Sequence, residues 1–205
     1  HELLVKTIKE HKRVIFNGNG YGDEWKAEAE KRGLPNFIST VDVLPCLTEP
    51  KNVELFTRFG VYSEVELHSR KEILLENYSK TINIEALTAA DMAKTEILPA
   101  VMKFGKDICD IAASKKAVGI EPVVEMATAT KVNDLTTALS ENAARLSDAI
   151  LKAQATEGAE KMARAYHDEV FALMQSLRAV ADELETIVGE EYWPYPTYDE
   201  LLFNV

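Results

Sequence analysis

One helix face places three potential metal ligands close together. His68, Glu72 and Glu76 are spaced at i, i+4 and i+8, so an α-helix would stack them on one side. A metal site of this kind normally recruits further ligands, and no second histidine lies nearby in the sequence. Arg70 and Lys71 stand beside the three residues, which favours a solvated or ion-paired face over a metal site.

A glycine-rich loop, Asn17–Gly22, is the second candidate, because bare backbone amides can hold a phosphate. Its spacing is neither GxGxxG nor GxxxxGK[ST], and it follows a predicted helix and not a strand. A plain turn between two helices is therefore the favoured interpretation. Its three glycines are expected to adopt positive φ angles.

The remaining reactive side chains are isolated from one another in the sequence. His11 and His167 lie alone on predicted helices, and no Ser/His/Asp or Cys/His set can be assembled. Cys46 and Cys109 sit among apolar residues, so we expect two buried thiols in a reducing compartment, although a single disulfide stays open. We assign no catalytic, cofactor-binding or metal-binding residue to this chain.

The first third of the chain should contain short helices. An opening helix over Glu2–Val14 has no N-cap before it and no initiating Met, which is expected of a segment taken from a longer protein. Asp23 can cap a second helix over Glu24–Arg32. A short turn of helix at Thr40–Leu44 and a helix at Pro50–Phe59 complete this part.

A long helix is predicted to begin at Ser63. The sequence Ser63-Glu64-Val65-Glu66 is a capping box, in which the serine and glutamate side chains each satisfy a backbone amide. This helix should reach about Leu87, with a possible break and restart at Thr88. Pro99 should kink whatever continues.

From Thr88 onward the pattern is helical in three segments, Thr88–Val118, Pro122–Thr156 and Ala159–Val188, separated by glycines. The second and third carry apolar stripes stepping by three or four residues, and the short linker at Gly158 makes them an antiparallel hairpin. The stripes are Val132, Leu135, Leu139, Ala143, Leu146, Ile150 and Ala153, then Met162, Tyr166, Val170, Leu173, Leu177, Val180, Leu184 and Ile187. We therefore predict a mainly α fold with a long antiparallel three-helix bundle.

An aromatic segment, Tyr192–Tyr198, follows the last helix. It holds three tyrosines, one tryptophan and two prolines, which is typical of an extended tail anchored on its own protein or on a neighbour.

The net charge and the distribution of apolar residues limit which partners and which cellular compartment are expected. The formal net charge is −11, which disfavours nucleic acid and anionic membranes. No apolar run is long enough to span a bilayer and no signal peptide opens the chain, so the cytoplasm is the expected location.

Several blocks resemble type III glutamine synthetases. His11–Trp25 (HKRVIFNGNGYGDEW) is similar to the segment after the catalytic barrel, Glu66–Leu87 (ELHSRKEILLENYSKTINIEAL) to a long helix, and Ile97–Val101 (ILPAV) to its kinked continuation. Trp193–Phe203 (WPYPTYDELLF) resembles the family's C-terminal end. Phe59–Ser63 (FGVYS) is a weaker match to the wider glutamine synthetase family.

The resemblance implies a fragment of a larger enzyme. The family makes glutamine from glutamate, ammonia and ATP through a γ-glutamyl phosphate, with Mg²⁺ or Mn²⁺ held by Glu and His residues on a barrel. No block here matches those metal-binding or phosphate-binding motifs, so the catalytic residues and cofactors belong to the parent enzyme and not to this chain. Residues 1–87 would close the catalytic domain, and residues 88–205 would form a type III extension.

Two kinds of function remain open on the sequence. The first is a structural segment of an ATP-dependent ligase that contacts the rest of its own subunit and sister subunits of a homo-oligomer. The second is a free-standing acidic helical module that binds other proteins. The resemblance favours the first.

Overall fold

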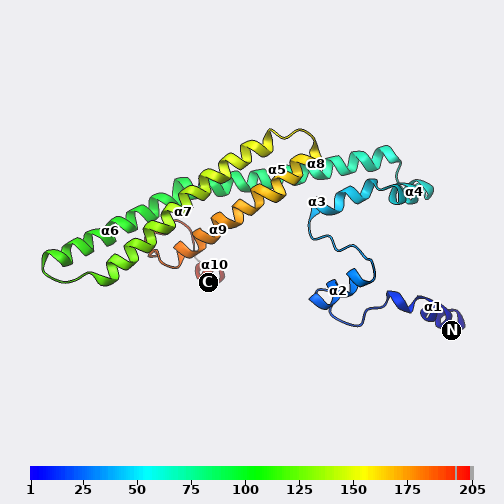
Figure 1. Ribbon diagram of the computed structural model, residues 1–205, viewed down its shortest axis with the longest axis horizontal. Coiled ribbons are helices and arrows are strands. Elements are labelled where there is room, and N and C mark those ends of the chain that lie inside the picture. Colours follow the sequence, from blue (N-terminus) through cyan, green and yellow to red (C-terminus); the bar gives the residue numbers. More distant parts are fainter. Residues whose placement is uncertain (197, 204–205) are drawn as a thin grey trace. The chain divides into compact units, whose positions relative to one another are not determined.

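The computed structural model describes residues 1–196 and 198–203 and confirms the mainly α class (Figure 1). No β-strand occurs in these described ranges. The chain divides into two compact units, His1–Val43 and Leu44–Val205, which are described separately.

The first unit contains α1 (Glu2–His11), the 3₁₀ turn η1 (Lys12–Val14), α2 (Asp23–Lys31) and α3 (Thr40–Val43). Arg32 ties α2 to the segment before it. Its guanidinium donates to the backbone oxygens of Arg13 at 2.8 Å and Ile15 at 3.3 Å. The predicted cap at Asp23 is wrong, because Gly22 is the N-cap and Asp23 is the first helical residue, where it pairs with Lys26 at 2.8 Å.

Positive φ angles occur where helices end and not in the glycine-rich loop. Among described residues they are found at Gly33, Gly60, Gly119 and Gly158, so the expectation for the Asn17–Gly22 loop is wrong. At Gly33 the φ of 70° lets Leu34 donate its amide back to the Ala29 carbonyl at 2.9 Å, which closes α2.

The second unit begins with η2 (Leu44–Thr48) and α4 (Pro50–Arg58), followed by α5 (Glu64–Met92). The capping box is confirmed. Ser63 Oγ accepts from the Glu66 amide at 3.3 Å, and Glu66 Oε2 accepts from the Ser63 amide at 2.7 Å. The Ser63 amide, followed by the Ser63 hydroxyl at 2.8 Å, donates to the Glu66 carboxylate and lowers its pKa, which keeps it charged at the positive end of the helix.

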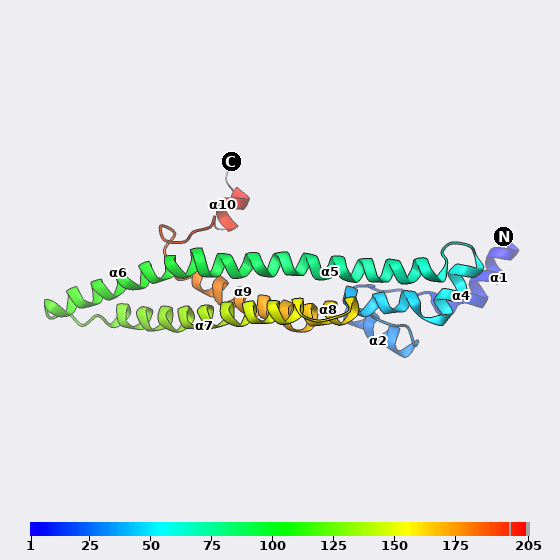
Figure 2. The ribbon, with the colours of Figure 1, turned by 90° about the horizontal axis from the view of Figure 1, so that it is seen from above.

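The long helix does not restart at Thr88, so that alternative is wrong. Thr88 lies inside α5, where its hydroxyl donates to the Ile84 carbonyl at 2.9 Å. A π-helical turn, η3 (Ala93–Ile97), joins α5 to α6 (Leu98–Ala117) just before Pro99, which has no amide to donate. Figure 2 shows α6 leaving the line of α5 near this turn.

Two further long helices complete the bundle: one runs back along α6 and α5, and the next turns again and runs in the same direction as α5. They are α7 (Val123–Gln154) and the continuous run of α8 (Ala159–Ala165), η4 (Tyr166–Phe171) and α9 (Ala172–Glu185), of which η4 is a second π-helical turn. Figures 1 and 2 both place α7 beside the other two, and it contacts α5, α6, η4 and α9. An ion pair between Lys115 and Glu125 spans the turn from α6 to α7.

Both predicted apolar stripes lie in or against one hydrophobic core. Leu139, Ala143 and Leu146 of α7 are fully buried. Val170 of η4 and Leu184 of α9 are fully buried as well. α5 adds Ile82, Ala86 and Ala90 to the same core. Removing these side chains from water is the main stabilisation of the unit, at about 25 cal/mol per Å² of apolar surface.

A small polar network joins α5, α7 and η4 at the edge of the core. Asn83 Oδ1 accepts from Gln154 Nε2 at 3.0 Å and from the Tyr166 hydroxyl at 2.9 Å. Tyr166 is 2% exposed, and burial raises its pKa. The network thus links one side chain from each of the three elements.

The aromatic tail lies on the bundle. The Tyr192 hydroxyl donates to Asp107 Oδ2 at 2.8 Å, and its ring meets Phe104 at 5.4 Å between centroids. Trp193 and Tyr195 also pack against the core. A short helix not predicted from the sequence, α10 (Tyr198–Phe203), follows, and Thr197 of the predicted segment lies outside the described residues.

Leu177→Asp should lower the free energy of unfolding by about 3 to 5 kcal/mol, because it puts an unpaired charge at a position that is 3% exposed. Ala179→Asp, two residues away on the exposed face of α9, should cost less than about 1 kcal/mol. Urea denaturation followed by circular dichroism measures both. Equal losses would show that Leu177 is not part of the core.

Tyr166→Phe should cost about 1 kcal/mol, since it removes one hydrogen bond to Asn83 and leaves the ring in place. Tyr21→Phe, at a ring that is 97% exposed, is the matched control and should leave stability unchanged. The same denaturation experiment measures the pair, and no difference between them would contradict a role for the network.

Candidate functional site

The His68, Glu72 and Glu76 face is an exposed side of α5. All three side chains are exposed, and Glu76 accepts a hydrogen bond from Lys80 at 3.2 Å. Lys71 reaches Glu160 of α8 at 3.1 Å. Within the described ranges, no group of three or more His, Cys, Asp or Glu residues is placed to hold a metal ion.

The glycine-rich loop already uses two of its amides internally. The Tyr21 amide donates to Asn19 Oδ1 at 3.0 Å, and the Gly22 amide donates to the Asn19 carbonyl at 3.1 Å. A Cβ on Gly18 would come within 2.7 Å of the Phe16 ring, which packs against Trp25 in a tilted arrangement with 4.8 Å between the ring centroids. Packing of this aromatic pair therefore accounts for the glycine at position 18.

The isolated histidines and cysteines stay apart. His11 is exposed, and His167 is half-buried with Nδ1 2.7 Å from Asp168 Oδ1. Both cysteines are free thiols. The expectation that both are buried is wrong, because Cys109 faces outward from α6 and Cys46 is half-buried. Burial, followed by the nearby Glu49 carboxylate, raises the pKa of the Cys46 thiol.

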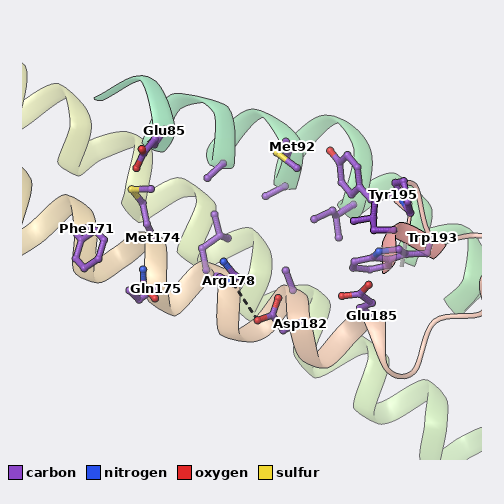
Figure 3. Close-up of a pocket in the computed structure, with 17 residues that line it drawn as sticks. Glu85, Met92, Phe171, Met174, Gln175, Arg178, Asp182, Glu185, Trp193 and Tyr195 are labelled. Atoms are coloured by element: carbon purple, nitrogen blue, oxygen red, sulfur yellow. Dashed lines mark hydrogen bonds and ion pairs between the residues drawn. The ribbon is translucent and has the colours of Figure 1, made fainter. Parts of the chain in front are cut away.

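A groove between α5 and α9, about 520 Å³ in volume, was missed by the sequence reasoning (Figure 3). Apolar side chains form its floor, and the aromatic tail closes one end. Met92, Phe171 and Met174 are among its lining residues, and they are not buried in the core. The stripe pattern identified the residues that face the core but gave no sign of a second apolar face.

Exposed apolar surface includes two clusters that could contact other proteins. On α1, which buries no residue, Leu3, Leu4 and Ile8 are 76%, 65% and 58% exposed. At the turn between α6 and α7, a cluster that we call the tip patch is also exposed; it consists of Val118, Ile120, Val123, Val124 and Met126. Exposed apolar clusters commonly mark contacts with other protein surfaces.

None of the helices in the described part of the chain is both long and apolar enough to cross a membrane.

Comparison with known proteins places these features in a family. The chain is 38% identical to a glutamine synthetase of Butyrivibrio fibrisolvens, 33% to a type-3 glutamine synthetase of Dictyostelium discoideum and 27% to a glutamine synthetase of Bacteroides fragilis. The matches cover 99–100% of this chain but only 28–29% of those proteins. The family model of the glutamine synthetase C-terminal domain matches residues 1–116. The chain therefore belongs to the glutamine synthetase C-terminal domain family.

Proposed function

We propose that this chain is the C-terminal part of a type III glutamine synthetase subunit, the ATP-dependent ligase that makes L-glutamine from L-glutamate and ammonia. Its own role is structural: it completes the subunit and contacts sister subunits of a homo-oligomer. Similarity along the full chain to glutamine synthetases more than three times as long carries the proposal.

The parent enzyme uses ATP with Mg²⁺ or Mn²⁺ and works in the cytoplasm. Its catalytic, cofactor-binding and metal-binding residues lie outside this chain. In support, the two surfaces with suggestive spacing have other uses, since the glycine-rich loop bonds to itself and Glu76 pairs with Lys80. Phosphoryl transfer needs several converging cations around the developing charge.

The division at residues 87 and 88 separates the end of the catalytic domain from a type III extension. It falls inside α5, so the two parts share one continuous helix. A rigid helix of this kind would transmit the position of the catalytic domain directly to the bundle.

The chain alone should neither form glutamine nor bind ATP with useful affinity. Calorimetric titration with ATP and Mg²⁺ or Mn²⁺, run beside a glutamine-forming assay, measures this. Turnover or a micromolar dissociation constant would contradict the proposal. Gly22→Ala and Glu72→Gln would then tell whether the loop or the α5 face is responsible.

The exposed apolar surfaces should make the isolated chain self-associate or bind an apolar dye. Replacing Val123 and Val124 of the tip patch with serine should reduce both effects, because these side chains are 68% and 72% exposed. The control replaces Thr130 and Thr137, exposed residues of α7, with serine and should change neither. Light scattering and dye fluorescence provide the measurements. A strict monomer at high concentration with no dye binding would count against a contact role.

A further inference from the structure

The groove between α5 and α9 is elongated. On α9 and the end of η4 its lining runs from Phe171 to Glu185, and on α5 and η3 it runs from Glu85 to Ile97. At 1.5 Å per residue, the longer side extends about 21 Å. Small-molecule sites are usually compact cavities, so a groove of this length better fits an extended partner.

The floor is apolar and adaptable. Met92 of α5 and Met174 of α9 are half-buried, Leu177 lies beneath them, and Phe171 is 40% exposed at one end. Methionine side chains are flexible and polarisable, and they are common on surfaces that bind amphipathic helices.

The rim is acidic on both edges. Figure 3 shows Glu85 on the α5 edge and Asp182 and Glu185 on the α9 edge. Arg178 interacts with Asp182, with Nε 3.4 Å from Oδ2. Neither Glu85 nor Glu185 forms an ion pair with any residue in the described part of the chain. Two carboxylates on opposite edges are thus available to cations of a bound partner.

The tail closes the other end of the groove with Trp193, Tyr195, Pro196 and Leu201. The Tyr195 hydroxyl is buried and makes no hydrogen bond of good geometry within the described chain, although the Glu96 carboxylate is near. Burial, followed by Glu96, raises the pKa of Tyr195 to about 12, so its hydroxyl stays protonated. The tail is anchored by Tyr192 on Asp107, which fixes this end wall in place.

We propose that this groove binds a basic amphipathic helix of a partner protein, which packs between α5 and α9 as a fourth helix. Apolar residues of the partner at i, i+3, i+4 and i+7 contact the methionines, while its flanking lysines or arginines meet Glu85 and Glu185. A second copy of the bundle is disfavoured, because the chain carries a net charge of −11 and its acidic rims would repel. The inference does not depend on the proposed function.

The test uses the full chain with Trp25→Phe, which leaves Trp193 in the groove wall as its one tryptophan. The probe is a synthetic leucine/lysine helix of about 14 residues, long enough to fill the groove. Saturable change in Trp193 emission is expected. Glu85→Gln with Glu185→Gln should weaken binding at least about fivefold, a loss typical of removing charge pairs at a partly exposed rim. Glu121→Gln with Glu141→Gln, at exposed carboxylates outside the groove, should change it less than about twofold.

Two further probes separate groove binding from general attraction of opposite charges. A peptide of the same composition with leucine and lysine out of helical register should bind at least about tenfold more weakly, and a leucine/glutamate helix should not bind. Equal loss in the two double variants, or equal binding of the out-of-register peptide, would overturn the proposal. The absence of any change in Trp193 emission with the peptide would also overturn the proposal. So would a change in Trp193 emission when the concentration of the chain alone is raised, because this would identify a second copy as the occupant.

Discussion

Burial of the apolar stripe of α7 is the constraint on which the second unit depends. Its central residues are fully buried, and the helix contacts α5, α6, η4 and α9. Six buried alanines belong to this core, at positions 143, 149 and 153 on α7, 86 and 90 on α5, and 93 on η3. Small side chains let helix axes approach closely, so the bundle is sensitive to volume as well as to polarity.

The features that depart from ideal helices are arranged around this core. Both π-helical turns, η3 and η4, contact α7, and the Asn83 network joins α5, α7 and η4. Each π turn adds a residue to a helical turn and so changes which side chains face the core beyond it. The groove lies between these two turns, with Ala93 and Ile97 of η3 towards the end closed by the tail and Phe171 of η4 at the opposite end. The two irregular turns therefore lie at the two ends of the groove between α5 and α9.

The features that could be predicted from the sequence are those determined by residues close together in the chain. Helical periodicity located the long helices and both stripes, and the Ser63 capping box located the start of α5, because each signal lies within a few residues of its effect.

The π turns were not predicted, since their cost is offset by packing against α7, which no local pattern records. The apparent cap signal at Asp23 failed for a local reason: Gly22 takes the N-cap position, and Asp23 pairs with Lys26 three residues on. The exposure of Cys109 was missed because its apolar neighbours suggested a buried segment, whereas only Ile108 is buried and Ile111 is 50% exposed. The groove could not be predicted because two helices and a tail distant in sequence build it together.

The most direct test of a C-terminal glutamine synthetase segment is the size of the natural polypeptide that contains these residues. An antibody raised against the bundle, used on an extract of the cells that make the protein, reports that size on an immunoblot. The predicted result is a single polypeptide several times heavier than the 22.9 kDa of this chain, co-purifying with glutamine-forming activity. A polypeptide of about 22.9 kDa that separates from that activity would contradict it and would favour a free-standing helical module.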